Sequence, residues 1–463
     1  MRQIIPSLLL LFIYFSISAR SENLPNIIII YADDLGYGDL SCFGAKEIAT
    51  PNIDRLATEG IKFTDFYSAS PVCSPSRAAL MTGRIPQRQG VTSVFFPESF
   101  TGMPTSEITI ADVLKSKGYA TAHVGKWHLG HQYQYLPLQR GFDEYYGIPY
   151  SNDMESVVYL KDNQVDSFFV DQHYTTRTYT RKSLDFIDRN SNKPFFLYLA
   201  HSMPHVPIYA SPEFQGTSKA GLYGDVIQEI DWSTGEILKK LEAEKILENT
   251  LIIFSSDNGP WLVMEDHGGS AGILREGKQF TFDGGMRVPT LAMWKAKIPA
   301  GQVYEDLAVM MDWFPTISTI VDADLPKDRA YDGENILAVL MGQEKREGDQ
   351  FLFFNMDRNY TLQGFRWGDW KVKLPYNGFR GSPGMKAVAP HGMLLFNLKN
   401  DPSENINLAS REPEQLQKMI QEMERARARL GEFPTPLVIR TPSDNSHYHY
   451  LQGKRKRKRG IEK

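Results

Sequence analysis

The sequence predicts an α/β fold with a large mixed, mostly parallel sheet flanked by helices, followed by a small C-terminal antiparallel sheet with a helix. Three apolar runs carry this prediction: "NIIIIYA" from Asn26, "FFLYLA" from Phe195 and "TLIIF" from Thr250. Continuous runs of this kind are typical of strands buried on both faces. Helical patterns alternate with them, and the pattern changes after Gly342. A chain of 463 residues can also build more than one domain.

Each of the three predicted strands ends in polar residues. Asp33 and Asp34 follow the first, "HSMPH" to His205 follows the second, and Asp257 with Asn258 follows the third. Sites in such sheets lie beyond the carboxyl ends of the strands. We therefore expect the functional groups to gather there.

The elements between and after these strands complete the organisation. Helices are expected in "TPNIDRLATEG", with Thr50 as N-cap and proline in the first turn, in "TIADVLKSKGY" and over Tyr223–Leu247. After the polar linker "GQEKREGDQ" come "FLFFNM", "YTLQGFRWGDWKVKL" and "HGMLLFNL", then the amphipathic "EPEQLQKMIQEMERARARL". We predict an α/β domain over 24–342 and a smaller α+β domain over 350–436.

The N-terminal segment has the pattern of a targeting signal, and the C-terminal segment is strongly basic. Residues 1–19 read as a signal peptide, with Arg2, a short apolar run and a cleavage site after Ser18 or Ala19. The run is too short for a spanning helix, so an exported, periplasmic or secreted protein is favoured over an anchored one. Residues 440–463 form a basic tail, read first as a solvated segment and second as a grip on an acidic polymer.

Composition excludes some classes of function. A net charge of −4 gives no general attraction for nucleic acid. The two cysteines, Cys42 and Cys73, permit at most one disulfide, so the fold must rest on its core. Nothing in the sequence fixes the oligomeric state.

Asp33, Asp34, Asp257 and Asn258 form the first candidate site. Three carboxylates and an amide supply only oxygen donors, which suit calcium, with magnesium as the alternative. Asp and Asn also serve as turn and cap residues, so one pair alone would not decide. Two such pairs at the ends of two core strands favour a metal site.

Cys73 is the second candidate. It precedes "SRAALM", which reads as the start of a helix, and a helix N-terminus favours anions and lowers a thiol pKa. Arg77, one turn later, can pair with an oxyanion. The alternative is an inert cysteine in the core.

At these residues the chain resembles a known family. "CSPSRAALMTGR" is similar to the signature of the type I sulfatases, and "GYATAHVGKWHLG" resembles their second signature. "PNIIIIYADDLGYGD", "SSDNGP", "HSMPH", "REGKQFTFDGGMRVP" and "LLFNLKNDPSENINLA" match further family segments in order, from about Asn26 to Ala409. The likeness is greatest to the arylsulfatase A and N-acetylgalactosamine-6-sulfatase branch.

The resemblance implies an alkaline-phosphatase-like fold and hydrolysis of sulfate esters. It implies that a separate formylglycine-generating (sulfatase-maturing) enzyme oxidises Cys73 to formylglycine (3-oxoalanine), which hydrates to a geminal diol. One hydroxyl attacks sulfur and expels the alcohol, and the other lets the group collapse to the aldehyde and release sulfate. Together with the branch, export favours a sulfated carbohydrate as substrate, such as a glycosaminoglycan or an algal polysaccharide.

The resemblance also implies a role for each matching residue. Calcium would be held by Asp33, Asp34, Asp257, Asn258 and the group made from Cys73. The diol and the metal carboxylates would be steadied by Arg77. Sulfate would be contacted by Lys126, Lys278 and His205, the last also as acid for the leaving alcohol. His128 would take up the proton released with the aldehyde, and Ser151 would line the pocket. Arg287 is expected to be structural.

Three alternatives stay open at this point. The pairs His128 with His131 and His201 with His205 raise zinc, but no cysteines or His-Glu-x-x-His frame accompany them. A hydrolase of phosphate or phosphonate esters uses similar chemistry, although such enzymes often hold two metals. A catalytically silent binder of sulfated glycans would keep the fold and leave Cys73 unmodified.

Overall fold

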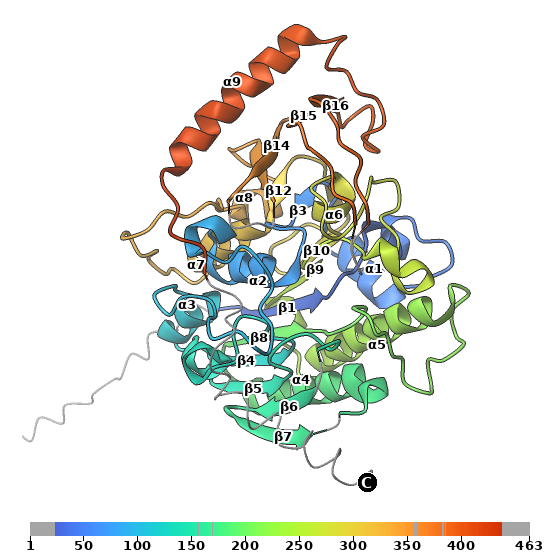
Figure 1. Ribbon diagram of the computed structural model, residues 1–463. Helices are drawn as coiled ribbons and strands as arrows, with labels where there is room; N and C mark the ends of the chain where they lie inside the picture. Colours follow the sequence, from blue (N-terminus) through green and yellow to red (C-terminus); the bar gives the residue numbers. More distant parts are fainter. Residues whose placement is uncertain are drawn as a thin grey trace, which may run out of the picture.

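Strand β1 (Asn26–Ala32) lies in the middle of a ten-stranded mixed sheet in the computed structural model (Figure 1). The structure describes residues 24–154, 157–168, 170–355, 359–381, 384 and 386–437. The predicted signal peptide at 1–19 and the predicted basic tail at 440–463 lie outside the described residues. Along the sheet the strand order is β11-β2-β10-β9-β1-β8-β4-β5-β6-β7.

The other strands of this sheet are β2 (Ile61–Phe63), β4 (Ala120–Gly125), β5 (Glu144–Gly147), β6 (Val158–Lys161), β7 (Gln164–Phe168), β8 (Phe195–Ala200), β9 (Thr250–Ser256), β10 (Thr290–Met293) and β11 (Gln302–Tyr304). The central run β9-β1-β8-β4-β5 is parallel throughout. The large mixed, mostly parallel sheet is therefore confirmed. Antiparallel pairing occurs toward the edges, at β9–β10, β10–β2, β5–β6 and β6–β7. All seven residues of β1 are buried, as its unbroken apolar run predicts.

Helices cover both faces of the sheet, because alternate residues of β1 point to opposite sides. Ile28 and Ile30 pack in a core with residues of α1 (Pro51–Thr58), α4 (Thr175–Asn190) and α5 (Gly221–Ala243). Ile27 and Ile29 pack on the other side with α2 (Cys73–Thr82), α3 (Ile110–Ser116) and α7 (Trp313–Ile320). Two short helices are α6 (Asp283–Met286) and α8 (Leu337–Leu340).

A second sheet forms the C-terminal part of the described chain. Its order is β13-β14-β15-β16, with each strand antiparallel to its neighbour. The bounds are β13 (Gln350–Phe354), β14 (Leu362–Trp367), β15 (Trp370–Lys373) and β16 (Leu394–Asn397), and α9 (Pro413–Leu430) packs on this sheet. A short two-stranded pair, β3 (Phe66–Tyr67) with β12 (Ala308–Val309), completes the strands. The small antiparallel sheet with a helix is confirmed as well.

The three predicted helices of the first domain form, with one correction at a cap. Thr109 begins α3 as a true cap, since its hydroxyl accepts a hydrogen bond from the Asp112 N–H at 3.0 Å. Thr50 precedes α1 but does not cap it with its side chain. Its hydroxyl instead donates to Asp54 Oδ1 at 3.0 Å and bonds with Ser41 at 2.7 Å. Thr50 therefore occupies the predicted N-cap position, while Asp54 and Ser41 engage the hydroxyl that would otherwise cap the helix.

Both cysteines within the described chain are free, so Cys42 and Cys73 form no disulfide. Cys73 is the first residue of α2, which begins where the sequence predicts a helix. No helix among the described residues is long and apolar enough to cross a membrane.

Candidate active site

Polar residues from four adjacent parallel strands meet at one edge of the sheet. Asp33 and Asp34 follow β1, Asp257 and Asn258 follow β9, and Lys126 follows β4. Carboxyl ends of neighbouring parallel strands lie at the same edge, which brings these residues together. The segment after β8 adds His205, helix α2 adds Cys73 and Arg77, and the loop before α6 adds Lys278. The structure thus collects the residues that the sequence analysis singled out.

Arg77 lies at the centre of this group and has no exposed surface. Its Nε and Nη2 lie 3.0 and 2.8 Å from Asp257 Oδ2, and its Nη2 lies 3.4 Å from Asp33 Oδ1. Its Nη1 donates to the Lys126 carbonyl at 3.1 Å. One guanidinium therefore ties helix α2 to the ends of β1, β9 and β4, using the several donors that arginine presents at once.

Two buried lysine amines form ion pairs with the carboxylates that follow β1. Lys126 Nζ lies 2.5 Å from Asp33 Oδ2 and 3.0 Å from Ser151 Oγ. Lys278 Nζ lies 2.7 Å from Asp34 Oδ2. Burial disfavours the charge on Lys278, but the Asp34 carboxylate outweighs it and raises the Lys278 pKa. Lys278 therefore keeps its positive charge at neutral pH in an interior position.

The acidic side of the group shows what a cation would meet. Burial disfavours the charge on Asp33, but the Lys126 amine, with His205 and Arg77, overcomes this and lowers its pKa. Burial and the nearby Asp33 charge raise the pKa of Asp257. Asn258 Nδ2 donates to Asp34 Oδ1 at 2.7 Å, whereas the buried Asn258 Oδ1 has no hydrogen-bond partner among the described residues.

These donors fit a hard cation. The unpartnered amide oxygen of Asn258 and the three carboxylates offer the oxygen ligands that calcium and magnesium take. Ligand atoms of Asp33, Asp34 and His205 also lie within 4.8 Å of one another. His205 was not predicted as a ligand, and neither His131 nor His201 belongs to this described cluster. One histidine among carboxylates does not make the nitrogen-rich set that a zinc site takes.

Cys73 lies within reach of both amines, but its thiol differs from the sequence expectation. Burial raises the pKa of Cys73 to about 11, even though Lys126 and Lys278 act to lower it. The predicted lowering of the thiol pKa is therefore wrong, because the side chain is only 2% exposed and desolvation outweighs the helix N-terminus and the amines. An unmodified Cys73 stays protonated at neutral pH and is a poor nucleophile.

Burial and nearby positive charges lower the pKa of both histidines of the site. Burial, with Lys126 and Arg77, lowers the pKa of His128, and burial with Lys278 lowers that of His205. His128 Nε2 bonds to the Phe95 carbonyl at 2.8 Å, while its buried Nδ1 has no partner in the described part of the chain. His128 and Asp34 also have left-handed backbones, with φ of 58° and 64°. Such uncommon backbones cluster at functional sites.

Two residues that the sequence analysis did not single out join the site. The Trp261 ring lies 4.4 Å from Lys278 Nζ and 5.5 Å from the His205 ring, and its Nε1 donates to the Gly384 carbonyl at 2.9 Å. Asp153 is exposed at the surface; desolvation acts to raise its pKa, but His205 and Lys126 outweigh it and lower the pKa. Trp261 directly follows "SSDNGP", so proximity to that segment could have found it; no sequence signal marks Asp153.

Arg287 is placed as the sequence analysis expects. Its guanidinium pairs with Asp65 and lies 3.6 Å from Asp283, and its Nε donates to the Thr64 carbonyl at 2.5 Å. These contacts hold chain segments together and do not reach the group around Arg77.

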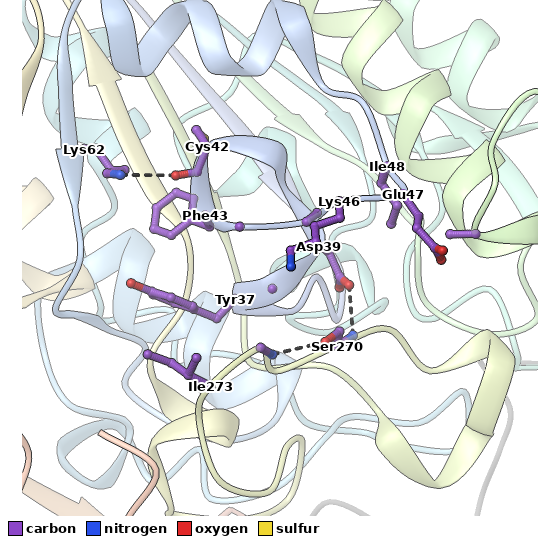
Figure 2. Close-up of a pocket in the computed structure, with 15 residues that line it drawn as sticks. Tyr37, Asp39, Cys42, Phe43, Lys46, Glu47, Ile48, Lys62, Ser270 and Ile273 are labelled. Carbon is purple, nitrogen blue, oxygen red and sulfur yellow. Dashed lines mark hydrogen bonds between the residues drawn. The ribbon is translucent and has the colours of Figure 1, made fainter. Parts of the chain in front are cut away.

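A separate pocket of about 770 Å³ is lined mainly by the segments 37–48 and 270–273 (Figure 2). Tyr37, Phe43 and Lys62 line it from one part of the chain, and Ser270 and Ile273 from another. Asp39 lies at its base, where its carboxylate accepts a hydrogen bond from the Ser270 N–H at 2.8 Å. None of the predicted site residues lines this pocket, so it is distinct from the group around Arg77.

Comparison with known proteins identifies the chain's relatives. The family model "Sulfatase" matches residues 25–323, and that for the "C-terminal region of aryl-sulfatase" matches 347–435. This chain belongs to the sulfatase family. The sulfatase is 39% identical over 429 residues to human N-acetylgalactosamine-6-sulfatase, an alignment that covers 83% of this chain and 81% of the relative.

Solved structures agree with this assignment. A sulfatase structure from work on glycosaminoglycan metabolism by Bacteroides thetaiotaomicron has a TM-score of 0.80 at 30% identity, covering 87% of this chain and 99% of that one. The PsFucS1 sulfatase from Pseudoalteromonas sp. has a TM-score of 0.80 at 28% identity, covering 89% and 92%. The chain is a sulfuric ester hydrolase, and its fold is the alkaline-phosphatase-like one that the resemblance implies.

The buried arrangement around Arg77 leads to a stability prediction. Replacing Arg77→Met leaves the Asp257 and Asp33 carboxylates buried without their guanidinium, which typically costs about 3–5 kcal/mol of unfolding free energy. Urea denaturation in the presence of EDTA measures the loss. The matched control is Lys239→Met, whose side chain is 69% exposed in its pair with Glu236 and should change stability by less than about 1 kcal/mol. Equal stability of the two variants would contradict the central role of Arg77.

Proposed function

We propose that this sulfatase removes sulfate from a sulfated carbohydrate, with the formylglycine made from Cys73 as nucleophile and calcium as its metal ion. The observation that carries the proposal is the pair of buried cationic amines, Lys126 and Lys278, beside Cys73 at the start of α2. An anionic ester is the group that such a pair of amines attracts, because a positive charge acts strongly on an anion where water is excluded. The relatives' names and the oxygen-donor cluster support the same reading.

Each residue of the site has a proposed part. Lys126 and Lys278 hold the sulfate oxygens and supply positive charge where negative charge develops. Arg77 fixes the first turn of α2, and with it residue 73, against the strand ends. His128, with its unpartnered Nδ1, takes up a proton beside residue 73. His205 donates a proton to the leaving alcohol. Ser151 orients the Lys126 amine through its hydroxyl.

Calcium and the formylglycine would supply the remaining chemistry. Calcium, held by Asp33, Asp34, Asp257 and Asn258 with residue 73, would act as a Lewis acid toward sulfate oxygens. The hydrated aldehyde would offer a hydroxyl for attack and a second one for release of sulfate. A separate maturing enzyme must form that aldehyde, since no residue of this site is an oxidant.

The substrate class rests on the relatives and on the site. Human N-acetylgalactosamine-6-sulfatase is named for a sulfated amino sugar, and the Bacteroides structure comes from work on glycosaminoglycans. Trp261, partly exposed beside the sulfate-facing Lys278, offers an aromatic surface of the kind that sugars pack against. We infer a sulfated carbohydrate. Export of the chain to a periplasm or the exterior is the location that fits such a polymeric substrate.

The reaction is tested by comparing matched aryl esters. Matured wild-type protein should release sulfate from an aryl sulfate faster than phosphate from the same aryl phosphate. Lys126→Ala should lower kcat for the sulfate ester by about 10²-fold, the usual cost of losing one such donor. Lys161→Ala, an exposed lysine on β6, is the control and should leave kcat unchanged. Faster release of phosphate would overturn the proposal, and tight glycan binding without turnover would indicate a silent binder.

The state of residue 73 has its own test. The tryptic peptide Phe63–Arg77 contains Cys73 and no other cysteine. In protein from its native host, its mass should fit an aldehyde in place of the thiol. Cys73→Ala should remain folded and abolish turnover. A native, active preparation whose peptide keeps an intact thiol would contradict the formylglycine proposal.

Calcium binding should be visible without turnover. In metal-free protein, calcium at about 100 times its Kd should stabilise the fold by about 2.7 kcal/mol. Asn258→Ala removes the unpartnered amide oxygen and should weaken binding, measured by titration calorimetry and by the calcium-dependent rise in melting temperature. Asp231→Asn is the control, because Asp231 is buried but bonds to Asn52 and Ile53 away from the site. Equal calcium responses in both variants would reject the proposed ligand set.

A further inference from the structure

The loop 275–284, which carries Lys278, is held at both ends by a single residue of the C-terminal part of the chain. Arg275 Nη1 donates to the Glu404 carbonyl at 2.8 Å, at the start of the loop. The Asp283 N–H donates to Glu404 Oε2 at 2.6 Å, at its end. The Gly284 N–H closes the loop on the Arg275 carbonyl at 2.8 Å. Glu404 therefore touches the two points where the loop enters and leaves.

The tip of the same loop reaches the chemistry. The Lys278 N–H donates to the Pro260 carbonyl at 2.8 Å, and the Gln279 N–H donates to the Pro71 carbonyl at 2.9 Å. Pro260 lies two residues after Asn258, and Pro71 lies two residues before Cys73. A displacement of the loop ends would therefore be transmitted to the backbone that sets the Lys278 amine.

Glu404 is buried and has a strained backbone conformation, and both are energetically unfavourable. The side chain has no exposed surface, and its backbone φ of 51° is in the left-handed region that non-glycine residues rarely adopt. Burial raises the pKa of its carboxyl, and Lys371 opposes that shift. Lys371 Nζ lies 2.9 Å from Glu404 Oε1 and 2.7 Å from Asp283 Oδ1. Strain and a buried charge of this kind persist where the surroundings fix them, and they mark positions with a task.

Lys373 supports the same loop from the C-terminal sheet. Its Nζ lies 2.5 Å from Thr281 Oγ1 and 4.4 Å from the Phe282 ring. The Arg275 guanidinium carbon lies 4.1 Å from the centre of the same ring. The contacts of β15 and Glu404 thus converge on the ends of one loop. Figure 1 shows α6, where the loop ends, between the large sheet and the C-terminal sheet.

We propose that Glu404 is a positioning residue that keeps the loop 275–284 closed and so fixes the Lys278 amine beside Asp34 and residue 73. It touches no reacting atom and acts through Lys278. This inference rests on the proposed function in one respect, namely that Lys278 contacts the sulfate. The competing explanation is that Glu404 and Lys371 form only a stabilising ion pair at the C-terminal sheet, and the two explanations differ in their effect on catalysis.

The decisive experiment is a double-mutant cycle in matured protein. Glu404→Ala should lower kcat/KM for an aryl sulfate by about 10- to 100-fold, the scale of loss from a slight misplacement of a binding group. In a Lys278→Ala background, Glu404→Ala should cause almost no further loss, because its effect passes through Lys278. Glu404→Gln, which keeps an oxygen to accept the Asp283 N–H, should retain most of the activity. Equal fold losses from Glu404→Ala in both backgrounds would overturn the proposal.

A control variant and a physical readout separate this inference from the proposed function. Asp401→Asn changes a carboxylate in the same segment, which accepts from Ile406 N–H at 2.7 Å and does not bond to the loop 275–284. Hydrogen exchange of 275–284 should rise in Glu404→Ala and stay unchanged in Asp401→Asn. If wild-type protein hydrolyses no sulfate ester, the proposed function fails while the exchange result still decides the role of Glu404. Unchanged exchange in Glu404→Ala would overturn it whatever the activity.

Discussion

The buried Arg77 guanidinium is the interaction on which the polar edge of the sheet depends. Without this guanidinium, the Asp257 carboxylate that follows β9 would lie buried beside Asp33 without the cation that contacts them both. Because Arg77 belongs to α2, compensating those charges also fixes the start of that helix against the strand ends. The position of residue 73 therefore follows from electrostatics of the core, one helical turn away.

Charge balance explains how so polar a group can be buried. Asp33, Asp34 and Asp257 contribute three negative groups, and Arg77, Lys126 and Lys278 contribute three positive ones. A divalent cation and a singly charged sulfate ester partly offset each other when both are bound. Each would be costly alone in a site with so little water. The acidic and basic halves of the site thus form one electrostatic unit.

Local signals in the sequence predict much of this structure. Unbroken apolar runs locate β1, β8 and β9, and a cap with a periodic pattern locates α3. Because the strands are parallel neighbours, their polar ends also predict which residues meet. Contacts between distant loops leave no such signal in the sequence. Tertiary packing alone sets the hydrogen bond between Lys126 and Ser151, the contact of Lys278 with the Trp261 ring, and the hydrogen bond from Asp283 N–H to Glu404. The prediction of a lowered Cys73 thiol pKa failed for the same reason, because tertiary packing determines how completely the thiol is desolvated.

The burial of Cys73 limits when another enzyme can reach its side chain. A side chain that is 2% exposed, in the first turn of a fully buried helix, cannot be handled by another macromolecule once the core has closed. Any enzyme that alters it must meet an extended stretch of chain, during synthesis or translocation. A molecule that folds before that encounter is committed to its unaltered form, with a protonated thiol shielded from solvent. Under the proposed modification of Cys73, the fraction of active molecules is then set by the relative rates of folding and of modification.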